Sequence, residues 1–222
     1  MIIDVLRLYA DRSDFFIQLF WEHIVLTVIS ILIITAIGIS LGILMTKSWR
    51  LARVVLTFTS FLYTIPSIAL FGFLVAITGI GSRSAIIALV MYGLLPVIRN
   101  TYSGIMEVPS QIVESAVAMG STNNQLLFKV QLPLALPIII TGFRTMVIMT
   151  ISLGGVASFI GAGGLGVAIW RGITTNFQEM TIAGSLLVAL LAIFADLLLA
   201  RVEALIKLRV LGRKATGGRK HA

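Results

Sequence analysis

Long apolar runs separated by short polar segments dominate this sequence of 222 residues. The clearest run, residues 24–45, contains no charged side chain. Because a helix that crosses the hydrocarbon core of a bilayer needs about 20 predominantly apolar residues, this run predicts a membrane-spanning helix. By the same criterion we predict four further spans, at residues 54–77, 84–103, 144–161 and 181–200. The expected fold is therefore all-α and transmembrane, with about five spans.

Prolines interrupt two of these apolar stretches. Pro66 falls in the middle of the second span, where it removes a backbone hydrogen bond and frees a carbonyl that needs a polar neighbour. With Thr64 and Ser67 beside it, we expect a kink that either lines a transport pathway or only serves packing. The apolar stretch 132–161 is longer than one crossing. We expect its first part, 132–143, to form an interfacial elbow before the fourth span.

The composition excludes several classes of protein. Hydrophobic residues make up 58% of the chain and charged residues 12%, whereas about a quarter of a soluble domain is charged, so lipid must solvate much of the surface. The chain has no cysteine, which excludes disulfides, thiolate metal sites and cysteine nucleophiles. Its two histidines, His23 and His221, lie near opposite ends of the sequence. We therefore predict no metal site and no catalytic residue.

The distribution of basic residues predicts an orientation, because cytoplasmic segments of membrane proteins are enriched in Lys and Arg. With the N-terminus outside, the outer segments hold 4 of these residues, namely Arg7, Arg12, Arg83 and Arg171. The inner segments then hold 12, namely Lys47, Arg50, Arg53, Arg99, Lys129, Arg201, Lys207, Arg209, Arg213, Lys214, Arg219 and Lys220. We expect an outer-face segment at 1–23, a transmembrane domain at 24–200 and a basic cytoplasmic tail at 201–222 that contacts lipid headgroups rather than nucleic acid.

One cytoplasmic loop, at about 104–131, is too polar to cross the membrane and too regular for a linker. Pro109 suits the first turn of a helix, on which Ile112, Ala116 and Gly120 would share a face. Gly120 suits the end of that helix, and Ser121 or Thr122 can cap a second short helix that Pro133 stops. The apolar stripe and the small residues around it predict a docking site for another surface.

The spacing of residues in this loop resembles the EAA loop of bacterial ABC importer permeases, which is written E-A-A-x3-G-x9-I-x-L-P. The matching positions are Glu114, Ser115, Ala116, Gly120, Val130, Leu132 and Pro133. Every interval agrees, and the departures are Ser115 for alanine and Val130 for isoleucine. In that family the segment is a coupling helix, which docks into a groove of a separate ATPase subunit and transmits its closure to the membrane helices.

Three further stretches resemble the subfamily that imports osmoprotectants such as glycine betaine, carnitine, choline and proline betaine. They are YTIPSIALFGFL (63–74), LLPVIRNTYSGI (94–105) and FIGAGGLG (159–166). Permeases for methionine share the five-span plan and a similar loop, so an amino-acid importer is the alternative. An ion-driven secondary transporter is a further alternative, which leaves the loop motif unexplained.

The resemblance implies a type I ABC importer permease with a methionine-permease-like fold, placed in the bacterial plasma (inner) membrane as a multi-pass subunit. Its partners would be ABC ATPase subunits, a second permease that is identical or homologous, an extracytoplasmic substrate-binding protein and the lipid bilayer. The sequence contains no G-x-x-x-x-G-K-[ST], so ATP and Mg would be bound by the partner ATPase and this chain would hold no cofactor.

A glycine-rich segment follows the fourth span. Gly161, Gly163 and Gly166 satisfy G-x-G-x-x-G, but that pattern binds a pyrophosphate only between a strand and a helix of a soluble unit. We instead expect these residues, with Gly164, to form a flexible or closely packed turn at the outer mouth of the pathway, or a plain structural turn.

Two charged residues fall near the ends of the last two spans. Arg144 is placed to extend its guanidinium toward the inner headgroups, because a charge in the middle of the bilayer is costly. Asp196 is placed for an ion pair with Arg99 or with Arg144.

Overall fold

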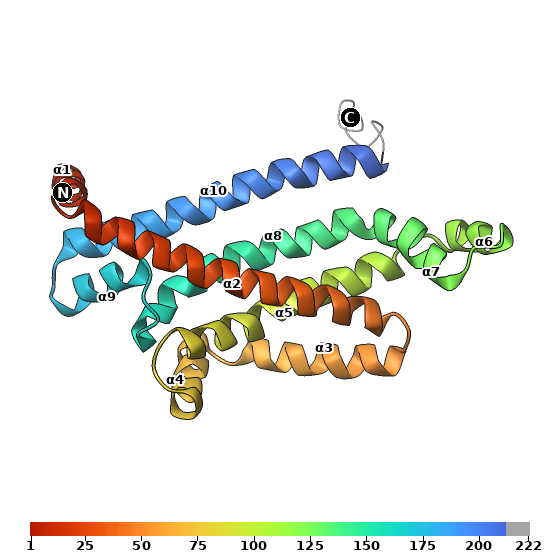
Figure 1. Cartoon of the computed structure of the whole chain (residues 1–222), viewed down its shortest axis with the longest axis horizontal. Helices are drawn as coiled ribbons and strands as arrows, with labels where there is room; N and C mark the ends of the chain where they lie inside the picture. The colour runs from red at the N-terminus through yellow and green to blue at the C-terminus, as the bar shows by residue number, and fades with distance from the viewer. Residues whose placement is uncertain (212–222) are drawn as a thin grey trace, which may run out of the picture.

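The computed structural model describes residues 1–211, and these residues form a bundle of helices (Figure 1). The elements in chain order are α1 Ile2–Asp11, α2 Ser13–Met45, α3 Trp49–Thr64, α4 Ser67–Thr78, α5 Ser82–Met106, α6 Ser110–Ala118, α7 Asn123–Gln125, the π-helix η1 Leu126–Gln131, α8 Leu132–Val156, the 3₁₀ helix η2 Ala157–Ile160, α9 Gly166–Thr174 and α10 Gln178–Leu211. The fold is all-α, as predicted.

Four of these segments are long and apolar enough to cross a membrane, and the α3–α4 pair is a fifth if its two halves make one span. The four are Ser13–Met45, Ser82–Met106, Asn123–Ile160 and Gln178–Val210. Three of them contain a predicted span, and Asn123–Ile160 covers all but the last residue of the predicted span 144–161. The two predicted boundaries at 23/24 and 200/201 fall inside continuous helices, α2 and α10. Arg213, Lys214, Arg219 and Lys220 of the predicted tail lie outside the described residues.

Helices α2 and α5 pack closely through glycines. A Cβ built on Gly38 would lie 2.7 Å from Val97 Cγ1, and one built on Gly42 would lie 2.5 Å from Thr101 Cβ. On α5, a Cβ at Gly93 would lie 2.4 Å from Ile34 Cδ1. Small residues let the backbones of membrane helices approach each other, which is how such helices gain packing energy without a hydrophobic driving force. Helix α5 therefore forms the centre of the bundle, where it packs closely against both α2 and α8.

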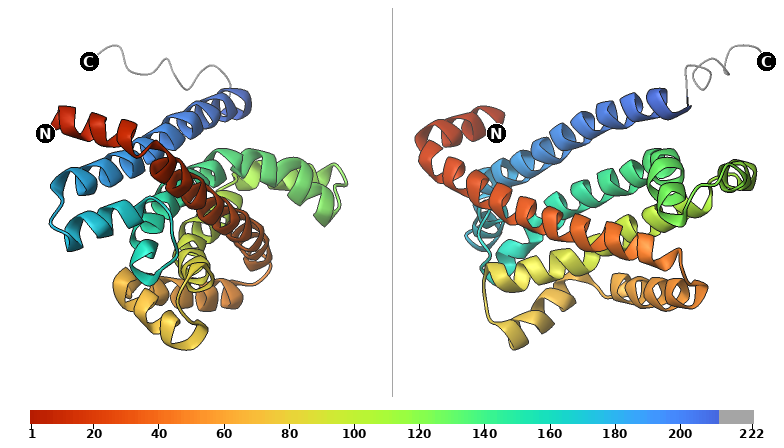
Figure 2. Two further views of the ribbon diagram at one scale, coloured as in Figure 1. Left: turned by 60° about the vertical axis from the view of Figure 1, so that its left-hand side comes forward. Right: turned by 45° about the vertical axis from the view of Figure 1, so that its right-hand side comes forward.

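The predicted interruption at Pro66 is confirmed as a sharp break, with α3 and α4 bent by 99° relative to each other. The carbonyl of Ile65, which belongs to no helix, accepts a hydrogen bond from the hydroxyl of Tyr92 on α5. The need for a polar neighbour at this break is thus met inside the chain. As Figure 2 shows, α4 turns away from the direction of α3.

The predicted division of 132–161 into an elbow and a span is wrong. Residues 132–156 form one continuous helix, α8, and Pro137 lies buried within it. Pro133 does not stop the preceding helix either. The preceding segment is the π-helix η1, at whose end the Leu132 N–H donates to the Leu127 carbonyl. Pro133 therefore falls in the first turn of α8, where its missing N–H costs little.

The exposed faces of the outer helices are apolar. On α2 the exposed side chains include Val28, Leu32, Ile33 and Ile37, and on α10 they include Leu186, Leu190, Ile193, Phe194 and Leu197. Such surfaces suit lipid tails rather than water. The bundle therefore presents a lipid-compatible belt, and the polar features described next lie at its two ends and along α8.

Candidate functional site

The loop between α5 and α8 folds as a helix, a tight turn and a second helical segment. The helix predicted near Pro109 is present as α6, which begins directly after that residue, so Pro109 is the N-cap and does not lie in the first turn. It ends in a left-handed turn at Gly120, which has φ +84°. The N–H of Gly120 donates to the Val117 carbonyl at 2.9 Å, and the N–H of Ser121 donates to the Ala116 carbonyl at 3.1 Å. This pair of bonds is a Schellman motif, which explains why a glycine stands at this position.

Thr122 caps the second segment. Its Oγ1 accepts from the Gln125 N–H at 3.3 Å, and the Gln125 side chain accepts from the Thr122 N–H at 2.9 Å. This reciprocal capping box fixes the direction in which the chain leaves the Gly120 turn. Because α7, η1 and α8 follow without a break, the turn is connected by helix to the centre of the bundle.

The seven motif residues fall into two groups. Glu114, Ser115 and Gly120 are exposed on α6 and its turn, and Ala116 is buried beneath them. Ser115 satisfies its hydroxyl locally by donating to the Gln111 carbonyl at 2.7 Å. The second group, Val130, Leu132 and Pro133, lies at the junction of η1 and α8. There Leu132 packs against the buried residues Ile105, Ala135 and Ile139.

Large apolar side chains are exposed around this loop. Ile112, Val117, Met119 and Phe128 are exposed by 41%, 53%, 80% and 61%, respectively. Helix α6 stands at the end of the molecule farthest from α1 and α9 (Figure 1). Exposed apolar residues grouped on a polar loop are typical of an interaction surface. The loop thus presents an exposed apolar face that includes Ile112 but not the buried Ala116 of the predicted stripe, and docking at this loop stays a prediction.

A hollow of about 600 Å³ lies between the C-terminal end of α2 and the α7–η1 segment. Its lining includes Thr46, Lys47, Asn123, Asn124, Phe128 and Gln131. Sequence reasoning did not find this hollow, because it joins residues far apart in the chain. It gives the loop a polar concave side next to the exposed apolar residues.

At the α3–α4 break, the three predicted pathway residues are partly or fully exposed. Thr64 and Pro66 are exposed and Ser67 is half-buried. The Thr64 hydroxyl donates to the Phe61 carbonyl of its own helix at 2.7 Å. The contacts to other helices come instead from Tyr63, whose hydroxyl lies 3.4 Å from Met149 Sδ on α8 and whose ring stands edge-on to Tyr92. In the sequence, this contact was signalled by Tyr63, an aromatic residue three positions before the mid-span Pro66.

The glycine-rich segment forms a closely packed turn. Gly161, Gly163 and Gly164 have φ values of +75°, +79° and +79°, a conformation that other residues rarely adopt. A Cβ at Gly166 would lie 1.8 Å from the Gly155 carbonyl oxygen, so α9 starts in direct contact with the end of α8. The turn follows a 3₁₀ helix rather than a strand. Of the two geometries expected for it, flexible or closely packed, the structure has the packed one.

Two adjacent residues of α2 hold this turn in place. Glu22 Oε2 accepts from the Gly164 N–H at 3.0 Å, and a Cβ on Gly163 would lie 2.6 Å from the same oxygen. His23 is fully buried, with Nε2 3.1 Å from the Ile151 carbonyl oxygen of α8. Its ring lies against Gly164 and Gly154. The turn is thus fixed on one side by a carboxylate and on the other by an imidazole.

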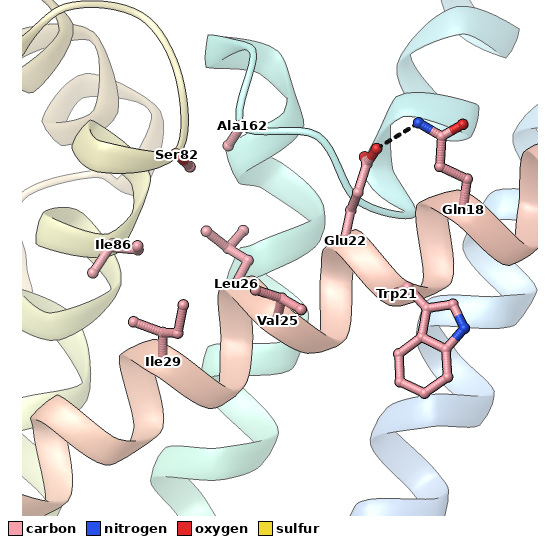
Figure 3. Close-up of a pocket in the computed structure, with 9 residues that line it drawn as sticks. All are labelled: Gln18, Trp21, Glu22, Val25, Leu26, Ile29, Ser82, Ile86 and Ala162. Carbon is pink, nitrogen blue, oxygen red and sulfur yellow. Dashed lines mark hydrogen bonds between the residues drawn. The ribbon is translucent and has the colours of Figure 1, made fainter.

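Next to this turn, a cavity of about 590 Å³ opens between α2, the start of α5 and the turn itself (Figure 3). Glu22 and Gln18, joined by a 2.8 Å hydrogen bond, stand at its polar edge. Val25, Leu26 and Ile29 of α2 make one apolar wall, and Ser82 and Ile86 of α5 with Ala162 of the turn lie across from them. The cavity lies at the end of the bundle opposite to α6.

The ion pair predicted for Asp196 is formed with Arg144 rather than Arg99. Arg144 Nε and Nη2 donate to the two carboxylate oxygens of Asp196 at 2.5 and 2.9 Å. Arg99 instead contacts Ser60 Oγ at 3.3 Å. The expectation that Arg144 extends to the headgroups is therefore wrong, because its guanidinium is held by acids of α10. Sequence reasoning missed Glu203, which binds the third nitrogen of the same guanidinium at 3.0 Å.

Among residues 1–211, no group of three or more His, Asp or Glu side chains is arranged to hold a metal ion. The polar features of the described chain are thus the exposed α6 loop at one end, a packed glycine turn at the other and an ion cluster between α8 and α10.

Comparison with known proteins places this arrangement in context. A family described as "Binding-protein-dependent transport system inner membrane component" matches residues 35–208. The chain is 39% identical over 196 residues to the glycine betaine/carnitine/choline transport system permease protein OpuCD of Bacillus subtilis, covering 88% of this chain and 86% of that protein. It is 37% identical over 209 residues to the osmoprotectant import permease protein OsmW of Salmonella typhimurium, covering 92% and 97%.

Among solved structures, the chain is similar to one from the MetNI methionine ABC transporter in inward-facing conformations. The TM-score is 0.73 at 26% identity, and the match covers 84% of this chain and 93% of that one. The methionine-permease-like fold expected from the sequence is confirmed by this likeness.

Proposed function

The chain belongs to the family of binding-protein-dependent transport system inner membrane components, and from this premise we propose that it forms half of the translocation pore of an ATP-driven importer for osmoprotectants. The solutes proposed are small quaternary ammonium compounds of the glycine betaine, carnitine and choline class. The observation that carries the proposal is the exposed α6 loop, which has the spacing of the family's ATPase-coupling segment and ends in the Gly120 turn.

Support for the substrate class comes from relatives that match the chain over most of its length. The two described above carry names that refer to osmoprotectants or to glycine betaine, carnitine and choline. The methionine transporter shares the fold at lower identity. A methionine or other amino-acid substrate is therefore the less favoured alternative.

The partners proposed are two ATPase subunits, a second permease and a substrate-binding protein that delivers solute to the outer face. ATP and Mg would be held by the ATPase subunits. In this arrangement the N-terminus lies outside and the C-terminus in the cytoplasm, which places α6 and the inner ends of α2 and α10 on the ATPase side. The exposed Ile112, Val117 and Met119 would then be buried against the ATPase.

The mechanism proposed is alternating access. Closure of the ATPases on ATP pulls the two α6 loops together, and the motion enters the membrane through the helical path from the Gly120 turn to α8. Tilting of the spans opens the pathway at the glycine turn, and hydrolysis restores the inward opening. A continuous helix is suited to this role, since it transmits displacement without a hinge.

A transport assay with a panel of solutes tests the substrate class. The chain is reconstituted in liposomes with its ATPase, its binding protein and, where it is separate, its second permease. We expect uptake of labelled glycine betaine that unlabelled carnitine or choline reduces and that methionine leaves unchanged. Uptake of methionine in place of glycine betaine would show that the substrate belongs to the alternative class, the amino acids.

A further inference from the structure

An ion cluster joins α8 to α10 in the inner half of the bundle. Arg144 of α8 binds both oxygens of Asp196 and one oxygen of Glu203, which stand about two helical turns apart on the same face of α10. Glu203 Oε1 lies 2.8 Å from the hydroxyl of Thr141, one turn before Arg144, and 2.6 Å from Lys207 Nζ. The guanidinium thus clamps two acids of the neighbouring helix.

The four charges of this cluster cancel, since two bases face two acids. The side chain of Glu203 is 9% exposed, and those of Arg144 and Asp196 are 31% and 32% exposed. Removing Arg144 or Asp196 alone leaves an opposite charge unpaired in a poorly solvated place, whereas removing the two together leaves neutral surroundings, and Lys207 is half-exposed, so its charge can be removed at little cost. The cluster can therefore be dissected without leaving an isolated charge behind.

The cluster adds charged contacts to an apolar seam, in which Ala195 and Leu199 of α10 pack against a buried cluster that includes Met146 and Val147 of α8. Toward the glycine turn, α10 packs on α9 and α1 as well as on α8. Toward its inner end, its exposed residues include Leu197, Leu198, Val202 and Leu205, so much of its surface is free. Figure 1 shows the C-terminal half of α10 beside α8, while α1 lies near the other end of α10. The Arg144 clamp is thus the charged link between the inner halves of these helices, beside this apolar packing.

Helix α8 is also the element that continues from the docking loop. The Gly120 turn leads through α7 and η1 into α8 without interruption, and Arg144 lies on α8 beyond the motif residues Leu132 and Pro133. Any displacement of the loop that moves α8 therefore acts on α10 through Arg144.

We propose that Arg144, Asp196 and Glu203 are positioning residues that make α8 and α10 move as one unit during the transport cycle. The proposal rests on the proposed function, because it gives the cluster a part in transmitting the motion of the loop. It does not require that these residues contact solute. A cluster that only served folding would matter for the amount of protein and not for the relation between ATP hydrolysis and transport.

The decisive variant is R144M/D196L, which removes one charge of each sign and leaves Glu203 paired with Lys207. The matched control is K207Q. It also removes a charge of the cluster, but Lys207 pairs with Glu203 within α10 and does not connect α10 to α8. In the reconstituted complex, we expect R144M/D196L to keep ATP hydrolysis while solute transported per ATP falls about tenfold, the scale of a typical coupling energy. K207Q is expected to keep the native ratio. A native ratio in R144M/D196L would overturn the proposal.

A distance measurement separates this proposal from the proposed function. The chain has no cysteine, so spin labels can be placed on single introduced cysteines without background. Labels at Leu136 on α8 and Leu205 on α10, both exposed, report the spacing of the inner halves. In the permease alone we expect a narrow distance distribution in the parent protein and K207Q, and a broad one in R144M/D196L. Equal widths would contradict the clamp, whatever the chain transports.

In the ATPase complex, the same labels should keep their spacing between the nucleotide-free and ATP-trapped states of the parent protein, and a changed spacing would contradict movement as one unit. A parent complex without solute uptake would contradict the proposed function instead.

R144K covers the case in which the double variant does not reach the membrane. It keeps the charge but lacks the planar fork that binds two carboxylates, so we expect it to broaden the distribution; native widths and a native transport ratio in R144K would overturn the proposal.

Discussion

The hydroxyl of Tyr92 on α5 donates to the carbonyl of Ile65 at the break between α3 and α4. This bond supplies, from a residue 27 positions away in the chain, the polar partner that the break requires. In a membrane an unsatisfied carbonyl has no water to bind, so the position of the break and the identity of residue 92 are linked.

Replacement of Tyr92 by phenylalanine should therefore destabilise the protein. The Ile65 carbonyl would lose its partner at a cost of about 1–3 kcal/mol. Tyr63→Phe is the matched control, because its hydroxyl contacts only a thioether and the side chain is 45% exposed. Thermal unfolding in detergent should show a lower midpoint for Y92F than for Y63F. Equal midpoints would mean that the break does not depend on this bond.

The turn at Gly120 offers a second test. A Cβ at this position would meet no atom within 4 Å in the described chain, so a larger side chain would project toward a partner rather than into the bundle. G120W should insert normally and abolish coupled transport. G120N, which tolerates a left-handed turn, should retain much more, since the strain of φ +84° is small for asparagine. Normal uptake by G120W would contradict docking at this turn.

Glu22 provides a third prediction, on the glycine turn. E22A removes the acceptor of the Gly164 N–H, whereas E22Q keeps a carbonyl oxygen at the same place. A hydrogen bond to a charged group contributes about 1.5–3 kcal/mol, so local opening should become easier by about tenfold or more in E22A. Hydrogen exchange of the turn should be faster in E22A and nearly native in E22Q. Unchanged exchange in E22A would show that His23 packing alone holds the turn.

Gly166 and Gly72 form a pair for testing close packing. G166A would force a Cβ within 1.8 Å of the Gly155 carbonyl oxygen, and the backbone shift should cost about 1–3 kcal/mol. G72A adds a Cβ to α4 with nothing within 4 Å, and it should stabilise that helix by about 0.5–1 kcal/mol. Unfolding midpoints should therefore move in opposite directions for the two variants, and a shift in the same direction would contradict the tight α8–α9 junction.

The sequence predicts local features of this protein well. Apolar run length located four spans and the broken α3–α4 pair, Pro66 located the break, and Pro109, Gly120 and Thr122 located the ends of the loop helices. Each of these signals acts on the backbone of its own neighbourhood, so one sequence suffices to find it. The spacing of the motif residues in the loop also indicated the family to which the chain belongs.

What the sequence did not reveal depends on distant partners or on backbone register. The one-residue widening of η1, which lets Pro133 enter α8 instead of ending a helix, follows from a shifted hydrogen bond between Leu132 and Leu127 that no residue type announces. Glu203 was missed because its partner Arg144 lies 59 residues away. The Tyr92 hydroxyl and the Glu22 anchor are long-range contacts of the same kind.

The central claim is that this chain moves solute only when a separate ATPase acts on the α6 loop. The most direct measurement is accumulation of labelled glycine betaine in liposomes that hold the permease and binding protein, with and without the ATPase and ATP. We expect accumulation only when both are present and when the loop is native, with G120W abolishing it. Accumulation by the permease without the ATPase, or under an ion gradient alone, would contradict the account.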